Sequence, residues 1–147
     1  MTATGHAIIG TVIAAKIGNP ALAIPLAVAS HVVADSIPHW DTATNRKEKS
    51  WNKLIFHTLI DISAGFLISF LLIYFLFPDT NYFYAVVMIF AAQSFDWLTA
   101  PYYFFKIQLF KPFYNLQKSF EHEIELPWGF MNQAIIVTAI VILAIIF

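Results

Sequence analysis

The sequence predicts an all-α membrane protein, a bundle of about five helices, from its composition, its apolar segments and its turn residues. Hydrophobic residues make up 59% of the 147 residues and charged residues 12%, whereas a soluble domain averages about 25% charged residues. A water-soluble fold of this composition would expose too much apolar surface. The length fits one domain, residues 1–147, with room for four or five spans of about 20 residues each.

Five apolar segments follow one another along the chain, and we expect each to be a helix. The two clearest are residues 53–77 and 129–147. No charge interrupts the run from Ile62 to Phe77, and the chain ends in the run AIIVTAIVILAIIF. With their flanking turns, both segments are long enough to cross about 30 Å of hydrocarbon. The remaining three segments are residues 3–18, 20–37 and 82–100.

Turn residues separate these segments. Gly18-Asn19-Pro20 predicts a tight hairpin between the first two, which form either short spans or a re-entrant pair. Pro78-Asp79-Thr80-Asn81 predicts the turn between the third and the fourth. We expect residues 101–127, which mix aromatics, prolines and charges, to lie along the membrane surface. No Lys or Arg precedes the first apolar run, so the sequence does not predict a cleaved signal peptide.

An up-and-down threading of the five segments brings polar residues that are distant in the sequence to one end of the bundle. All five histidines and all nine acids except Asp79 then lie at that end. All eight Lys and Arg residues except Lys16 lie there as well. By the positive-inside bias, we expect this end and the N-terminus to face the cytoplasm, in a multi-pass protein of the cytoplasmic (inner) membrane.

The sharpest local pattern is a His-x3-Asp pair that occurs twice. His31 and Asp35 stand four positions apart on the second helix, and His57 and Asp61 repeat the spacing on the third. Residues i and i+4 share a helix face, so each pair can present an imidazole nitrogen and a carboxylate oxygen to one ion. Two such pairs on facing helices, joined by His6, predict a site for a divalent metal: zinc first, with manganese or iron as alternatives.

Asp96 and His39 are the predicted catalytic residues. Asp96 interrupts an apolar run, where an ionisable group costs roughly 2.5–3.5 kcal/mol to insert and usually serves a function or a pair. It can ligate the ion, orient a ligating imidazole or act as general base; the alternative is a hydrogen bond within the bundle. Pro38 ends the second helix, which lets His39 turn back toward the site. Secondary candidates for the site are Asp41, Glu121 and His122.

Several function classes are not supported by the sequence. Cysteine is absent, so there is no thiolate metal site and no cysteine nucleophile. The net charge of -1 argues against a nucleic-acid partner, because phosphate contacts need a basic surface. Gly-rich phosphate loops and Gly-x-Ser-x-Gly are also missing, which argues against nucleotide enzymes and the serine hydrolases that use this nucleophile motif.

These motifs carry a family resemblance. The chain resembles small prokaryotic inner-membrane proteins described as membrane-bound metal-dependent hydrolases, among them the LexA-regulated ones. The residues that carry it are Thr4-Gly5-His6, Ser30-His31-x3-Asp35-x-Ile37-Pro38-His39-x-Asp41 and His57. The resemblance covers residues 1–65 well and the stretch from Pro127 to Gln133 more loosely. It implies a cytoplasmic-membrane protein with a His/Asp metal site and a hydrolytic role.

A fainter similarity links the chain to zinc-dependent phospholipase C, an all-α enzyme with His-x3-Asp and His-x3-Glu ligand pairs. His31 and Asp35 would match one pair, and His57 and Asp61 the other. The chain departs from that pattern because it lacks the N-terminal Trp ligand and is far shorter and membrane-embedded. A trinuclear site does not follow from this similarity.

We therefore expect a membrane-bound metal-dependent hydrolase that acts on a phosphoester or lipid-like substrate, with membrane lipids as its partners. Two other classes stay open. A proton or metal-ion transporter would use the same His and Asp residues as a pathway, but residues 53–77 and 129–147 offer almost no polar group toward the far side. A non-enzymatic membrane interaction protein would use them as a hydrogen-bonded plug or a docking surface and would need no metal.

Overall fold

The computed structural model describes all 147 residues and is built from helices, which confirms the all-α prediction. The first, second, third and fifth of the expected segments each form one helix. The fourth segment, residues 82–100, is divided into two helices. The elements are α1 (Ala3–Lys16), α2 (Pro20–Ser36), the 3-10 helix η1 (Arg46–Glu48), α3 (Trp51–Leu76), α4 (Tyr82–Ala92), α5 (Ser94–Phe105), the 3-10 helix η2 (Gln108–Phe110), α6 (Lys111–Phe120) and α7 (Trp128–Ile146).

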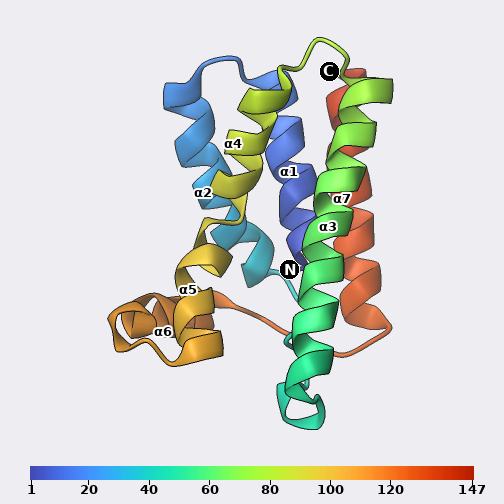
Figure 1. Ribbon diagram of the computed structural model, residues 1–147. Helices are drawn as coiled ribbons and strands as arrows, with labels where there is room; N and C mark the ends of the chain where they lie inside the picture. The colour runs from blue at the N-terminus through green and yellow to red at the C-terminus, as the bar shows by residue number, and fades with distance from the viewer.

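Helix α1 lies at the centre of the bundle, in contact with α2, α3, α4 and α7. Figure 1 shows these five helices side by side, while α5 and α6 lie at the end where α2 finishes. The ten residues from Gly5 to Ala14 are all buried. A helix buried on all sides is apolar around its circumference, and this stretch consists of alanines, isoleucines, glycines and a valine. Its two polar residues are His6 and Thr11, whose hydroxyl bonds back to its own helix.

Glycines allow α1 to approach its neighbours closely. A Cβ atom at Gly10 would lie 2.7 Å from the backbone oxygen of Met88 in α4. A Cβ atom at Gly65 of α3 would lie 3.1 Å from the Cβ of Ala7. Small residues at helix crossings are typical of membrane bundles, in which van der Waals contact between backbones replaces the hydrophobic effect.

Many large hydrophobic side chains of α3 and α7 are exposed on the surface, whereas a soluble protein buries most side chains of this kind. Leu67, Leu71 and Phe75 on α3 and Ile135 and Ile142 on α7 are exposed. Extensive apolar surface of this kind marks a contact with lipid or another apolar partner. Both helices are long and apolar enough to cross a membrane, with a mean hydropathy of 2.2 for α3 and 2.3 for α7.

The structure supports two or three spans rather than five. Helices α4 and α5 qualify as a span only when they are taken together. The two helices are bent by 54° relative to each other at Gln93. Helix α1 has 14 residues and α2 has 17, so at 1.5 Å per residue they reach roughly 21 and 26 Å, short of the ~30 Å hydrocarbon thickness. The predicted polytopic bundle of about five helices, with the first two as short spans or a re-entrant pair, therefore holds in its coarser form: an all-α fold with two or three candidate spans.

Local sequence signals explain where the helices begin and end. The side chain of Asn19 accepts a hydrogen bond from the backbone nitrogen of Ala21 and caps α2, as the predicted hairpin requires. Ile37, directly before Pro38, is extended and ends α2. Ser50 caps α3 by accepting from the backbone nitrogen of Lys53, so α3 begins two residues earlier than predicted.

Candidate metal centre

Three histidines and two aspartates converge where α1, α2 and α5 meet. His6 comes from the first turns of α1, and His31 and Asp35 come from the last turns of α2. We call this group the His–Asp cluster: His6, His31, Asp35, His39 and Asp96. Its convergence confirms that the start of the first helix and the end of the second share one end of the bundle.

The carboxylate of Asp35 lies at the centre of the cluster. Its Oδ1 lies 3.0 Å from Nε2 of His6 and its Oδ2 lies 3.1 Å from Nε2 of His31. Nε2 of His39 lies 3.9 Å from Oδ1. The amino group of Met1 also contacts Oδ1. The side chains of these residues are at most 1% exposed, so water does not compensate their charges.

Backbone carbonyls fix the tautomers of two of the histidines. Nδ1 of His31 lies 2.8 Å from the carbonyl oxygen of Ala92, and Nδ1 of His39 lies 2.8 Å from that of Ile37. A carbonyl oxygen only accepts, so each Nδ1 carries the proton and donates it. In the neutral ring Nε2 is then a bare acceptor, and both Nε2 atoms are buried without a hydrogen-bond partner.

The rings of His6 and His31 stack on each other. Their centroids lie 4.0 Å apart and their planes differ by 11°. Nε2 of His6 is hydrogen-bonded to Asp35, and Nδ1 of His6 is buried without a partner. Two imidazoles packed face to face disfavour a positive charge on both, so at least one of the two rings is neutral and offers a lone pair.

Gln117 of α6 ties two acids of the cluster together. Its Nε2 donates to Oδ1 of Asp96 at 3.2 Å and to Oδ2 of Asp35 at 3.4 Å. Asp96 Oδ1 lies 3.8 Å from Nε2 of His31. Gln117 was not among the predicted site residues, because a glutamine on a surface helix carries no spacing signal that marks it as part of a site.

The cluster fits a divalent metal. One atom each from His6, His31 and Asp96 lie within 4.8 Å of one another. Two ligands bound to zinc at about 2.0–2.2 Å with tetrahedral angles stand roughly 3.3–3.6 Å apart. The separations of 3.1 and 3.8 Å from Nε2 of His31 to Asp35 and Asp96 bracket that value. In a neutral ring the lone pair of Nε2 faces a carboxylate, a repulsive contact that a bound metal ion or a second ring proton relieves.

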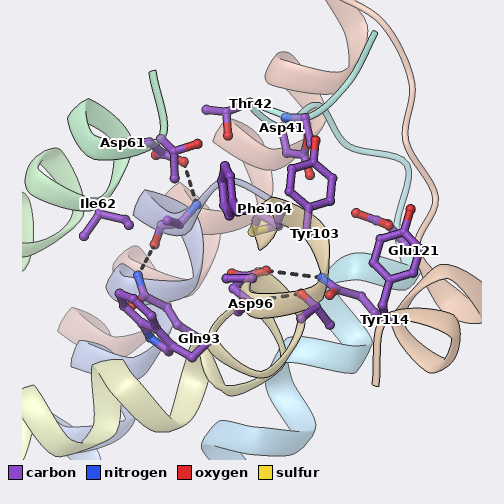
Figure 2. Close-up of a pocket in the computed structure, with 18 of the residues that line it drawn as sticks. Asp41, Thr42, Asp61, Ile62, Gln93, Asp96, Tyr103, Phe104, Tyr114 and Glu121 are labelled. Atoms are coloured by element: carbon purple, nitrogen blue, oxygen red, sulfur yellow. Dashed lines mark hydrogen bonds between the residues drawn. The ribbon is translucent and has the colours of Figure 1, made fainter. Parts of the chain in front are cut away.

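A cavity of about 190 Å³ opens beside the cluster. Asp96 of the cluster and Gln117, which is hydrogen-bonded to it, line the cavity, and the side chain of Asp96 is 36% exposed. Figure 2 shows Asp96, Asp61 and Glu121 around this space. The aromatic part of the lining consists of Trp97, Tyr103, Phe104 and Tyr114. At about 30 Å³ per water molecule, the volume leaves room for several waters or a small polar group.

A second group of candidate ligands is formed by Asp41 and Glu121, which line the same cavity, and by His39, which does not line it. Atoms of His39, Asp41 and Glu121 lie within 4.8 Å of one another. Burial lowers the pKa of His39, which keeps its ring neutral, and burial raises the pKa of Glu121 to about 7. Burial alone would lower the pKa of Lys118, but its hydrogen bonds with Glu121 and Glu123 raise that pKa overall.

The second His-x3-Asp pair does not join the cluster. Helix α1 packs between α2 and α3, so the two pairs do not lie on facing helices as the sequence suggested. The carboxylate of Asp61 accepts from the backbone nitrogens of Ala3 and Thr4 and from the Thr4 hydroxyl. It therefore caps the N-terminus of α1 while lining the far wall of the cavity.

His57 and His122 lie outside both ligand groups. His57 is partly exposed, with its ring beside that of Phe56, and it does not line the cavity. The ring of His122 is exposed. Its backbone nevertheless donates to the carbonyl oxygen of Asp35 at 2.9 Å and accepts from the nitrogen of His39 at 3.0 Å. This residue contributes its main chain to the site and leaves its imidazole outside.

Comparison with known proteins adds no relative: no family model, no curated protein and no solved structure matches the chain.

Proposed function

We propose that this chain is a membrane-bound metal-dependent hydrolase that cleaves a phosphoester or another ester of a lipid-like substrate. The metal ligands in this proposal are His6, His31 and Asp35, which leave a coordination position open for water, and Asp96 is the general base beside it. The ion is divalent, with zinc as the first choice because the donors are imidazole nitrogens and carboxylate oxygens. His57 and Asp61, which the sequence suggested as ligands, are not part of the proposed set.

One observation carries the proposal. His31 donates Nδ1–H to the backbone carbonyl of Ala92 and leaves a buried, unpartnered Nε2 3.1 Å from the Asp35 carboxylate. Ligating histidines are commonly held by a hydrogen bond of this kind from the other ring nitrogen. A hydrogen-bonded plug without metal would need a second proton on this ring, or would leave the acceptor unsatisfied in a buried site at a cost of roughly 1–3 kcal/mol.

A bound divalent ion would lower the pKa of a water molecule toward neutrality. Asp96 is suited to accept the proton of that water, because its side chain reaches the cavity while Gln117 holds its Oδ1. In hydrolysis, the water oxygen bonds to the phosphorus or acyl carbon and the bond to the leaving alcohol breaks. The proton held by Asp96 then passes to the leaving oxygen.

A lipid substrate agrees with the surroundings of the cavity. Trp97 and Phe104 line it and leave an apolar wall next to the acids. Exposed Phe105 and Leu109 continue that apolar surface outside. Lysines and an arginine gather at this end of the helix bundle. By the positive-inside bias, we propose that this end of the bundle faces the cytoplasm. The sequence resemblance to membrane-bound metal-dependent hydrolases supports the same proposal.

Metal analysis of the detergent-purified full chain tests the proposal first. We expect at least one equivalent of zinc, manganese or iron in the parent and a loss of it in His31→Ala. His57→Ala is the matched control, since this histidine lies outside the cluster, and it should keep its metal. A parent without metal, and unable to take it up, overturns the hydrolase proposal.

Turnover tests the second half of the proposal. Mixed-lipid vesicles containing the reconstituted protein should release a water-soluble headgroup or a fatty acid, and a chelator should stop the release. Asp96→Asn should lose turnover. Metal that binds without any lipid turnover, together with ion uptake into sealed vesicles, would instead indicate a transporter.

A further inference from the structure

We propose that the cavity holds a second divalent cation, bound by His39, Asp41 and Glu121, and that Lys118 supplies the compensating positive charge when this ion is absent. The proposal rests on the proposed function only for the role of the ion in hydrolysis. The site itself depends on residues that the first metal does not use.

His39 is oriented for this site by its own backbone. Its Nδ1 donates to the carbonyl oxygen of Ile37, two residues earlier, which leaves Nε2 as the available atom. That Nε2 is completely buried and has no hydrogen-bond partner. The carboxylate oxygens of Asp41 and Glu121 lie within 4.8 Å of the histidine atom and of each other, and ligands at 2.0–2.6 Å from one ion are separated by at most about 5 Å.

Main-chain pairing holds Glu121 beside His39. The segment after α6 runs along the end of α2: the nitrogen of His39 donates to the carbonyl oxygen of His122 at 3.0 Å, and the nitrogen of Ile124 donates to the carbonyl oxygen of His39 at 2.7 Å. His39 and Glu123 form an isolated parallel bridge. These bonds fix the two segments to each other and set the distance between the imidazole and the Glu121 carboxylate.

Asp41 has one oxygen committed to the loop and one available. Its Oδ1 accepts from the backbone nitrogens of Ala43 at 2.6 Å and Thr44 at 2.8 Å. These bonds orient the carboxylate without neutralising its charge. A carboxylate held in place by hydrogen bonds, together with a neutral imidazole, is a usual pair of ligands in metal sites built from nitrogen and oxygen donors.

Lys118 occupies the position of a counter-ion. Its ammonium nitrogen lies 2.6 Å from Oε2 of Glu121 and 2.6 Å from Oε1 of Glu123. The side chain of Lys118 is 41% exposed, whereas that of Glu121 is 6% exposed, so the lysine can swing out into water while the carboxylate stays. A divalent ion and the ammonium group compete for Glu121, because the two cations repel each other.

Zinc titration of the chelator-stripped full chain, followed by metal analysis after desalting, tests the proposal. The parent should bind two equivalents of zinc, and Glu121→Gln and Asp41→Asn should each bind one. Glu48→Gln, the control that removes an exposed glutamate, should still bind two. Lys118→Met keeps the length of the side chain without its charge and should bind the second equivalent roughly tenfold more tightly.

The outcomes separate the two proposals. A parent that binds one equivalent, lost in His31→Ala but kept in Glu121→Gln, overturns the second site and leaves the proposed function in place. A parent that binds none overturns both. Two equivalents in both Glu121→Gln and Asp41→Asn overturn the ligand assignment, and an unchanged affinity in Lys118→Met overturns the role of the lysine. Helical content by circular dichroism identifies any variant that fails to fold, and the parent stoichiometry decides independently of the variants.

Discussion

Nε2 of His31 lies 3.1 Å from Oδ2 of Asp35, one helical turn away, and yet it has no hydrogen-bond partner. The proton of the ring is on Nδ1, held by the carbonyl oxygen of Ala92 at 2.8 Å. A lone pair therefore faces a carboxylate inside a buried site. A metal ion between the two atoms, or a second proton on the ring, stabilises this arrangement, and the predictions about the cluster are those of the metal-bound form.

Replacing the central carboxylate should abolish metal binding. Asp35→Asn keeps the shape of the side chain but removes the charge that faces three histidines. We expect metal affinity to fall by more than about 100-fold, beyond the range for outer-shell changes, as measured by competition with a chromogenic chelator. Asp79→Asn, an exposed acid at the opposite end of the bundle, is the control. Unchanged affinity in Asp35→Asn would contradict the assignment.

Gln117 should matter without binding metal itself. Its amide holds both Asp35 and Asp96, so Gln117→Leu releases two carboxylates that must keep a fixed orientation. Loss of such support typically costs roughly 10- to 100-fold in metal affinity. Gln108→Leu changes an exposed glutamine on the neighbouring η2 and should leave affinity unchanged. Equal affinities in the two variants would show that Gln117 has no positioning role.

The packing under His39 should tolerate no extra methyl group. A Cβ atom at Gly129 would lie 2.6 Å from the nitrogen of Trp40 and 2.8 Å from the carbonyl carbon of His39. These are backbone atoms that cannot move aside, so Gly129→Ala should destabilise the fold by about 1–3 kcal/mol. A lower thermal midpoint in detergent is the expected measurement. At Gly18 no atom lies within 4 Å of the added group, and Gly18→Ala should leave the midpoint nearly unchanged.

Helix positions and the polar end could be predicted from the sequence, because apolar runs and turn residues act locally. The break at Gln93 could not. There the side chain of Gln93 donates to the carbonyl oxygen of Ala3, and this contact exists only once α1 and α4 are packed. The segment predicted as one helix over 82–100 is therefore two helices meeting at an angle.

For the candidate site, too, the local pattern could be predicted from the sequence and the contacts that depend on helix packing could not. The spacing of His31 and Asp35 places both on one helix face whatever surrounds them, so this pair was found. His57 and Asp61 have the same spacing, but the position of α1 between α2 and α3 decides what each pair faces. Only the packed structure shows that Asp61 caps α1 and that Gln117 reaches the cluster from α6.

Removing the cap of α1 should weaken the fold. Asp61→Ala leaves the backbone nitrogens of Ala3 and Thr4 without their acceptor, while the Thr4 hydroxyl keeps the backbone carbonyl oxygen of residue 61. Hydrogen bonds to a charged group contribute about 1.5–3 kcal/mol, and the cap also complements the helix dipole. We expect a lower thermal midpoint in detergent with metal stoichiometry retained. Loss of metal at an unchanged midpoint would instead make Asp61 a ligand, as the repeated spacing first suggested.

Charges on the outer face of α3 should disrupt membrane integration. Leu67 is 60% exposed and Leu71 46% exposed, and both lie well inside the candidate span. Each arginine at the centre of a span costs roughly 2.5–3.5 kcal/mol on insertion scales, so Leu67→Arg/Leu71→Arg should move much of the protein into the carbonate-soluble fraction. Asn52→Arg, at the exposed start of the same helix, should stay integrated because an arginine there reaches water. Full integration of the double variant would mean that this face of α3 does not meet lipid.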